Sequence, residues 1–186
     1  HNRVVVIEVM GRDAGWIALT AGVAGGAHVI LVPEKPIDLD HVCGILKHNR
    51  EHGKKYGIVV VAEGAKLPGS GEQATKGTQV DSFGHARLAG IADHLADEIE
   101  KKTGYETRSV TLGHTQRGGT PTAYDRMLAT RYGLAAIDLV HQGKFGRLVV
   151  LHGTKIEDIP LAEAISKNRT VDDSFLSIIS GLEPKL

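Results

Sequence analysis

Short runs of aliphatic, largely β-branched residues constrain the fold of this chain more than any other feature of its sequence. They cover residues 4–9, 28–32, 57–62, 107–112 and 147–151. Most carry apolar side chains on both faces, which is typical of strands in a parallel sheet with helices on either side. The runs therefore predict a buried, mainly parallel sheet.

Stretches with helical periodicity separate these runs. In residues 38–52 the apolar side chains recur at helix spacing, and Asp38 is a plausible N-cap. The pattern returns in residues 85–103. A third helix is expected to open at Thr120-Pro121, with proline at the first helical position, and to run to about residue 142. The alternation predicts an α/β fold, a layered α/β sandwich with a mainly parallel sheet.

Length and composition narrow the class of protein. A chain of 186 residues is expected to form a single domain over 1–186. Its 22 basic and 22 acidic residues balance, so no net field would recruit nucleic acid or an anionic membrane. No apolar run reaches the roughly 18 residues of a membrane helix. Cys43 is the only cysteine and cannot form a disulfide within the chain, which fits a reducing, cytoplasmic setting.

The segment 64–84 does not follow the alternation. It has five glycines and weak periodicity, and it is longer than ordinary connections in compact domains. A tolerated surface insertion is the plainer interpretation. A lid or a subunit contact is the functional one.

Polar segments follow three of the predicted strands. Met10-Gly11-Arg12 follows the first, Glu63 the third, and residues 113–119 (Gly-His-Thr-Gln-Arg-Gly-Gly) the fourth. Because ligands of open α/β sheets bind beyond the carboxyl ends of the strands, these segments are expected to form one site. Arg12 or His114 alone would be an ordinary loop residue, whereas a glutamate directly after an apolar strand is less usual. The shared rim of these segments is what favours a site. Arg12 offers a forked donor for phosphate or a sugar hydroxyl, and Asp13 is expected to cap the following helix.

Two further arginines, Arg3 and Arg108, lie at the amino ends of their predicted strands. A six-residue strand separates its two ends by about 20 Å. Neither arginine should therefore reach the rim site of its own chain. They form ordinary surface salt bridges, or they serve a second site made with another subunit.

Five stretches, in this order, resemble the carboxyl-terminal half of 6-phosphofructokinases. They read "VVVIEVMGRDAGW", "AGGAHVILVPE", "IVVVAEGA", "ETRSVTLGHTQRGGTPTAYDR" and "GLAAIDLV". MGR followed by GH-x-QRGG is the most specific part of the resemblance, which implies a phosphofructokinase-like fold. The long 64–84 segment is similar to the longer variants of the family, which include pyrophosphate-using and mixed-type enzymes.

The resemblance implies a fructose 6-phosphate site and a homo-oligomer. The residues that it places against the substrate are Met10, Gly11, Arg12, Glu63, His114, Thr115, Gln116 and Arg117. Glu63 matches a carboxylate that accepts from sugar hydroxyls, whereas His114 and Arg117 match residues that hold the 6-phosphate. Arg3 and Arg108 match arginines that the family donates to the site of the neighbouring subunit, which explains their place on the other rim.

The resemblance also implies what this chain lacks. In the family, an amino-terminal half carries the glycine-rich segment for the phosphoryl donor and Mg²⁺, and a Thr-Ile-Asp-Asn-Asp segment with the catalytic base. Neither motif occurs in this sequence. No catalytic residue and no metal ligand are therefore expected in this chain, and Mg²⁺ with ATP or pyrophosphate is expected only in the complete enzyme. The start at His1, close before the first strand, suggests a fragment or a processed chain.

Other interpretations stay open at this point. A stand-alone module that senses a sugar phosphate without chemistry would use the same residues. A dinucleotide-binding domain is disfavoured, because no G-x-G-x-x-G follows the first strand. The phosphoryl donor and the choice between dimer and tetramer are undetermined. So is allosteric control, although Glu34 and Lys54-Lys55 match positions near the effector site of bacterial relatives.

Overall fold

The computed structural model describes residues 2–67, 75–80, 86–88 and 90–185. The chain divides into two compact units, residues 1–116 with 170–186 and residues 117–169. Each unit is described by itself. The expectation of a single domain over 1–186 stays a prediction.

The first unit is built on a four-stranded parallel sheet in the order β2-β3-β1-β6. The strands are β1 (Val4–Val9), β2 (Val29–Leu31), β3 (Gly57–Ala62) and β6 (Thr107–Thr111). Val4 pairs with Gly57 on one side and with Thr107 on the other, so β3, β1 and β6 begin level with one another. Their carboxyl ends therefore meet at one rim, as the predicted site requires.

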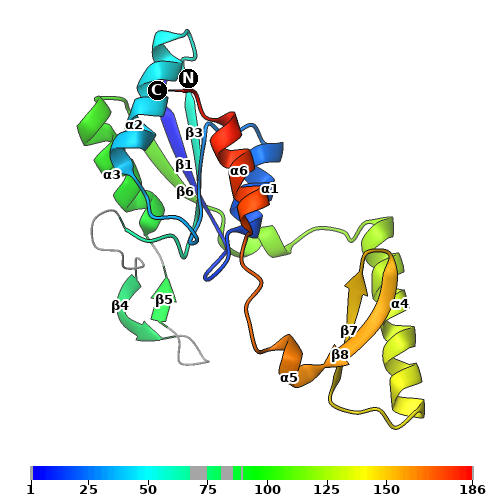
Figure 1. The fold of residues 1–186 in the computed structure, drawn as a ribbon. Helices are drawn as coiled ribbons and strands as arrows, with labels where there is room; N and C mark the ends of the chain where they lie inside the picture. Colours follow the sequence, from blue (N-terminus) through cyan, green and yellow to red (C-terminus); the bar gives the residue numbers. More distant parts are fainter. Residues whose placement is uncertain (1, 68–74, 81–85, 89, 186) are drawn as a thin grey trace. The chain divides into compact units, whose positions relative to one another are not determined.

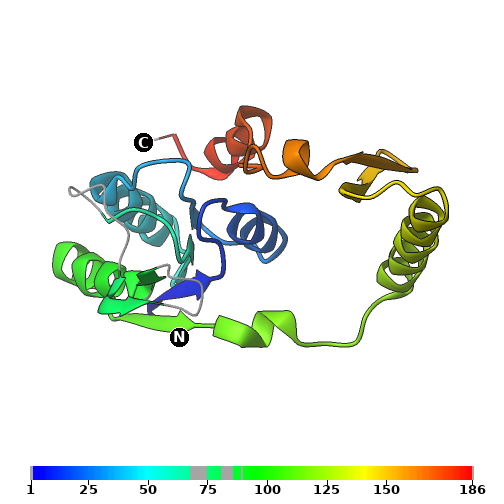
Figure 2. The same ribbon diagram turned by 90° about the horizontal axis from the view of Figure 1, so that it is seen from below.

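Helices cover the two faces of this sheet (Figures 1 and 2). On one face lie α2 (Leu39–Glu51) and α3 (Ile91–Thr103), packed through Ile45, Leu95 and Ile99. On the other lie α1 (Trp16–Ala24) and α6 (Asp173–Leu182), where the Trp16 and Phe175 rings meet edge to face at 5.2 Å. The pattern that predicted an amphipathic helix in 38–52 is confirmed, and Asp38 caps α2 by accepting from the His41 N–H.

A buried carboxylate inside β1 replaces a missing helix cap. Gly90 stands at the N-cap of α3 and has no side chain to offer the first turn. Oε2 of Glu8, a residue that is only 3% exposed, instead accepts from the Ala92 N–H at 3.1 Å. An acceptor at this position satisfies one of the orphan donors of the helix and meets its positive end. The helix predicted over 85–103 consequently begins at Ile91, and the short strand β5 (Ala86–Leu88) precedes it.

Part of the irregular 64–84 segment forms β4 (Thr75–Val80), which pairs antiparallel with β5. Residues 68–74 and 81–85 of the segment and its surroundings lie outside the described residues. The choice between an insertion, a lid and a subunit contact stays a prediction.

The second unit contains α4 (Ala123–His141), β7 (Arg147–His152), β8 (Lys155–Pro160) and α5 (Leu161–Ala164). The expectation that 147–151 joins the parallel sheet is wrong: β7 pairs antiparallel with β8 in a separate hairpin. The expectation of a helix that opens at Thr120-Pro121 is also wrong by two residues. Thr122 is the N-cap of α4, where Thr122 and Asp125 form a reciprocal capping box.

Among the described residues, no helix is both long and apolar enough to cross a membrane.

Candidate functional site

Residues 10–15, which we call the 10–15 loop, leave the carboxyl end of β1 and lead into α1. The Met10 N–H donates to Oε1 of Gln116 at 3.1 Å, and the Gly11 N–H donates to Oε1 of Glu63 at 3.3 Å. Segments that follow β1, β3 and β6 thus meet at one rim. The structure brings together four of the predicted site residues, Met10, Gly11, Glu63 and Gln116, from segments up to 106 positions apart.

Two glycines allow the close approach of the backbone in this loop. Gly11 has φ +143°, and a Cβ there would lie 2.8 Å from the Ala14 carbonyl oxygen. Gly64 donates its N–H to the Gly11 carbonyl at 3.0 Å. A Cβ on Gly64 would lie 1.8 Å from the carbonyl oxygen of Arg12. Only glycine fits at residue 64 without displacing the loop that carries Arg12.

The third polar segment forms a 3₁₀ helix, η1 (Gly113–Arg117). Nε2 of Gln116 donates to the Gly113 carbonyl at 2.9 Å, so this amide links the turn to Met10. The Thr115 hydroxyl donates to the Leu112 carbonyl. His114 and Arg117 are exposed, and Arg117 is the first residue of the second unit. The substrate-binding roles predicted for η1 stay predictions.

The structure corrects the role expected for Asp13. The N-cap of α1 is Gly15, without a side-chain hydrogen bond at the cap, and Asp13 is exposed. Arg12 beside it is half-buried. The Gly15 N–H is taken by Glu34, whose Oε1 and Oε2 lie 3.0 and 3.2 Å from that nitrogen.

The sequence analysis did not place Glu34 at this rim, although its position after a predicted strand indicated it. It lies three residues beyond β2, as Glu63 lies directly beyond β3. Applied to the predicted strand 28–32, the rule that pointed to Glu63 would have pointed to Glu34 as well. The sequence analysis matched Glu34 and Lys54 to the same effector region. In the structure Lys54 precedes β3 and therefore lies at the opposite end of the sheet from Glu34.

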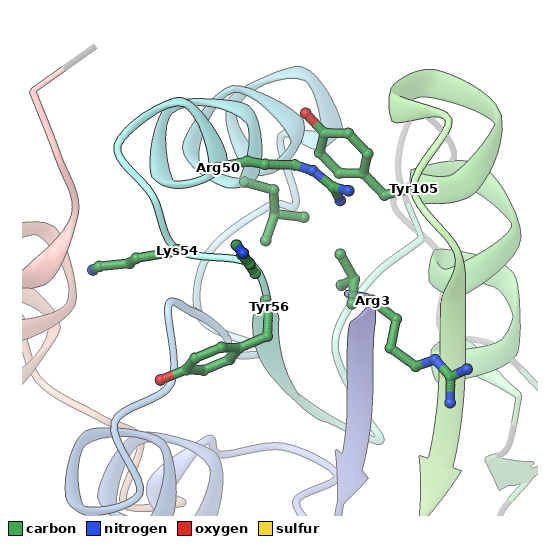
Figure 3. A pocket seen from close by; sticks show the side chains of 9 residues that line it. Arg3, Arg50, Lys54, Tyr56 and Tyr105 are labelled. Carbon is green, nitrogen blue, oxygen red and sulfur yellow. The ribbon is translucent and has the colours of Figure 1, made fainter. Parts of the chain in front are cut away.

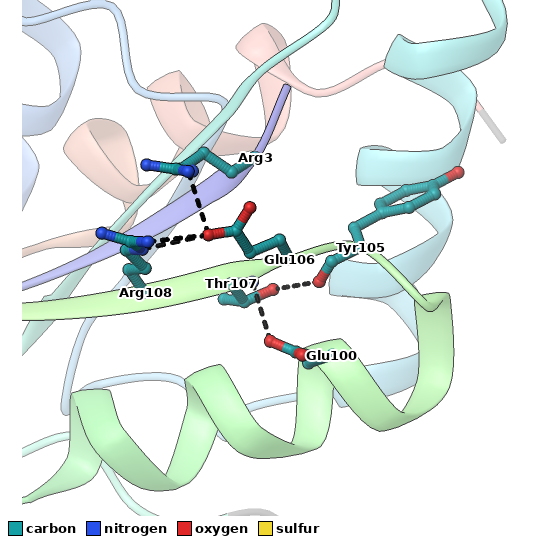
Figure 4. Close-up of polar contacts among 6 residues, drawn as sticks. All are labelled: Arg3, Glu100, Tyr105, Glu106, Thr107 and Arg108. Carbon is teal, nitrogen blue, oxygen red and sulfur yellow. Dashed lines mark hydrogen bonds and ion pairs between the residues drawn. The ribbon is translucent and has the colours of Figure 1, made fainter. Parts of the chain in front are cut away.

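Arg3 and Arg108 lie at that amino end, away from the 10–15 loop. Arg108 pairs with Val5 in the register of β6 and β1. One oxygen of Glu106, Oε1, contacts a guanidinium nitrogen of Arg3 at 3.0 Å and of Arg108 at 3.0 Å (Figure 4). Partial burial opposes ionisation of Glu106, but the two guanidinium groups outweigh it and hold the pKa of this carboxyl below its ordinary value.

More cations surround a shallow pocket at the same end (Figure 3). The Arg50 guanidinium stacks 4.1 Å from the centre of the Tyr105 ring, a cation–π contact that fixes its orientation. Lys54, Lys55 and Arg3 also line the pocket. Burial, with the charge of Lys54, lowers the pKa of nearby His28. The amino end of the sheet is therefore rich in positive charge.

Within the ranges that the structure describes, no three His, Cys, Asp or Glu side chains are grouped so that they could hold a metal ion.

A family model of phosphofructokinase matches residues 1–140. The chain belongs to the phosphofructokinase family. It is 54% identical over 175 residues to a pyrophosphate–fructose 6-phosphate 1-phosphotransferase of Streptomyces coelicolor, covering 94% of this chain and 51% of that protein. It is 50% identical over 174 residues to an ATP-dependent 6-phosphofructokinase of Mycobacterium tuberculosis, covering 94% of this chain and 50% of that protein. This family member therefore spans about half the length of these curated relatives.

The fold of a solved phosphofructokinase agrees with this membership. The phosphofructokinase structure from Saccharomyces cerevisiae superposes with a TM-score of 0.73 at 30% identity, covering 98% of this chain and 22% of that one. The predicted α/β fold with a mainly parallel, phosphofructokinase-like sheet is confirmed. The names of the two relatives differ in the phosphoryl donor. Because the chain is about equally identical to both, its sequence similarity does not decide which donor is used.

Proposed function

We propose that this chain is the fructose 6-phosphate-binding, carboxyl-terminal part of a 6-phosphofructokinase. The complete enzyme would transfer a phosphoryl group from ATP or pyrophosphate to the 1-hydroxyl of fructose 6-phosphate. The observation that supports this most directly is the convergence of the 10–15 loop, Glu63 and Gln116 at one rim of the sheet. Both relatives compared above carry a phosphofructokinase activity in their names.

The chemistry of the rim suits a sugar phosphate. The Glu63 carboxylate can only accept hydrogen bonds, which suits sugar hydroxyls. Arg12 and Arg117 can donate in pairs to phosphate oxygens or hydroxyls, and the imidazole ring of His114 adds an N–H donor. The hydrogen bonds from Met10 and Gly11 hold the loop beside Glu63 before a ligand arrives, which lowers the ordering cost of binding.

The arginine pair at the amino end supports a shared site. Val9, where β1 ends before the 10–15 loop, lies four positions after Val5, the partner of Arg108. At about 3.3 Å per residue, this spacing alone exceeds 10 Å. We propose that Arg3 and Arg108 reach the site of a neighbouring subunit in a homo-oligomer.

We propose that the phosphoryl donor, Mg²⁺ and the catalytic base belong to the half of the relatives that this chain does not span. Phosphoryl transfer depends on positioning and on charge stabilisation by metal and cations. We therefore expect no turnover by this chain alone with ATP or pyrophosphate and Mg²⁺. Turnover would contradict this part of the proposal.

Calorimetric titration of the 186-residue chain tests the binding role. We expect fructose 6-phosphate to bind and fructose, at the same concentrations, not to bind, because the phosphate supplies the charge-assisted contacts. Oligomeric state is recorded in the same samples. Equal binding of the two sugars, or of neither by a folded oligomer, would contradict the proposal.

Arg117→Ala sharpens this test. A hydrogen bond to a charged group is worth about 1.5–3 kcal/mol, so we expect the affinity for fructose 6-phosphate to fall about tenfold to a hundredfold. Lys167→Ala, which removes a positive charge from another exposed residue of the second unit, is the matched control and should leave the affinity unchanged. An unchanged affinity in Arg117→Ala would remove Arg117 from the site.

A further inference from the structure

The 10–15 loop is fixed by three side chains that come from three different segments. Gln116 and Glu63 accept from Met10 and Gly11 at its start, and Glu34 accepts from Gly15 at its end. Arg12 lies between these attachment points. The position of its Cα therefore depends on both ends of the loop, and only the start is held by residues already placed in the candidate site.

The end of the loop is held tightly from two sides. Gly15 is buried, and a Cβ there would lie 2.4 Å from Cγ1 of Val32, so the backbone packs directly on the residue that follows β2. Both oxygens of Glu34 face the Gly15 N–H. Pro33, between Val32 and Glu34, has its own φ torsion fixed by its ring.

The same carboxylate holds a second, distant segment. Oε1 of Glu34 accepts from the Val171 N–H at 2.8 Å, across 137 positions of sequence. Val171 is buried, 4% exposed, and lies where the chain re-enters the first unit and leads into α6. One side chain thus ties the end of the 10–15 loop to the segment that returns from the second unit.

We infer that Glu34 is a positioning residue for the sugar-phosphate site. It acts through Gly15 to hold the 10–15 loop in place, and it couples the loop to the return of the chain at Val171. This role rests on the proposed function for its effect on ligand binding, whereas the attachment itself does not. Glu34 is not a catalytic residue, because its carboxylate accepts hydrogen bonds from the backbone N–H groups of Gly15 and Val171.

Glu34→Gln tests the inference because it keeps the size of the side chain. In glutamine an NH₂ group takes the place of Oε2 and faces the Gly15 N–H, which is also a donor. The remaining oxygen is neutral and would have to accept from both Gly15 and Val171, which weakens both hydrogen bonds. The matched control is Glu51→Gln, the same change at an exposed residue at the end of α2. Amide hydrogen exchange of Gly15 and Val171 reports the attachment, since protection falls when an N–H loses its acceptor.

Ala92 provides an internal reference, because its N–H is also held by a carboxylate, that of Glu8. In Glu34→Gln we expect faster exchange at Gly15 and Val171 with unchanged exchange at Ala92. We also expect weaker fructose 6-phosphate binding in the titration, on the order of tenfold, the lower end of what a hydrogen bond to a charged group is worth. Glu51→Gln should change none of these quantities.

The outcomes separate the inference from the proposed function. Faster exchange at all three amides would indicate general destabilisation and overturn the positioning role. Faster exchange at Gly15 with unchanged affinity would overturn it too, because the site would not depend on the loop end. If the wild-type chain does not bind fructose 6-phosphate, the proposed binding role fails. Exchange at Gly15 and Val171 then still decides whether Glu34 fixes the loop.

Discussion

The two ends of the parallel sheet carry polar side chains that are held in different ways. At the carboxyl end, oxygens of Gln116, Glu63 and Glu34 accept from backbone N–H groups of the 10–15 loop. At the amino end, Arg3 and Arg108 share one oxygen of Glu106, a side chain that is 49% exposed. Bonds to backbone fix the path of a loop, whereas exposed ion pairs between long side chains exchange easily with water.

This difference agrees with two different tasks. A loop fixed by its backbone can hold Arg12 in one geometry beside Glu63, which favours binding of a small rigid ligand. Arginine side chains that are paired only with an exposed carboxylate can leave it and bind another anion instead. We therefore interpret the carboxyl rim as a preformed site. We interpret the amino end as a group of arginines that are able to bind an anion presented by a neighbouring subunit. The following predictions test this comparison.

The largest effect is expected from Gly64→Ala, which attacks the preformed loop. The new Cβ would overlap the Arg12 carbonyl, and overpacking of this kind costs about 1–3 kcal/mol or more. If the whole cost falls on the loop, affinity for fructose 6-phosphate drops by about two orders of magnitude. Titration calorimetry and urea unfolding of the same samples measure the two effects.

Gly181→Ala in α6 is the control for this substitution, because a Cβ there meets no atom within 4 Å. Alanine is the better helix former, so we expect unchanged binding and a stability gain of at most about 1 kcal/mol. Wild-type affinity in Gly64→Ala would show that the position of the 10–15 loop does not govern the site.

A mixed oligomer tests the role of the amino end, and the change in activity that we expect is of intermediate size. Chains of the complete enzyme with Arg12→Ala and chains with Arg108→Ala should each be impaired. In randomly mixed dimers about a quarter of the sites should recover, because an isologous interface gives each mixed dimer one site with both changes and one with neither. Turnover after unfolding and refolding the two chains together, compared with the separate chains, measures the recovery.

The absence of recovery in the mixed oligomer would place Arg12 and Arg108 in the site of the same chain. It would thereby contradict the separation of tasks between the two ends of the sheet.

The smallest effect is expected from Glu106→Gln. Because the pKa of Glu106 is lowered in the folded state, its ion pairs stabilise the fold above the ordinary pKa of glutamate, about 4.3, and this contribution disappears as the pH falls through the lowered value. Glu106→Gln should therefore be slightly less stable than wild type at neutral pH. The difference should vanish in acid, where both side chains are neutral.

Urea unfolding at pH 7 and well below pH 4 measures this difference, with Glu51→Gln as the control. A gap that persists in acid would show that Glu106 supports the fold by packing or neutral hydrogen bonds. The amino end would then be more rigid than exposed ion pairs imply.

Much of the first unit could be predicted from local pattern. Strands 4–9 and 57–62 have the bounds that their apolar runs indicated, and the rim shared by Met10, Gly11, Glu63 and Gln116 followed from the parallel arrangement. The run 147–151 was assigned to the wrong sheet, because an apolar run does not name its partner strand. His152 and Lys155 are joined by only two residues, and Gly153 has φ +62°. A short connection with glycine is typical of a β-hairpin, and the sequence analysis did not use it.

The sequence by itself determined the alternation of strands and helices, the phosphofructokinase family and the rim at which its polar segments gather. These follow from apolar periodicity and from motifs whose residues are close together in the chain. Only the tertiary structure decided that Glu34 holds Gly15 and Val171, that Glu8 rather than a neighbouring residue serves α3, and that one oxygen of Glu106 joins Arg3 and Arg108. A hydrogen bond depends on where two atoms lie to within a few tenths of an ångström. For residues far apart in sequence, that position is fixed by the packing of the whole sheet and its helices.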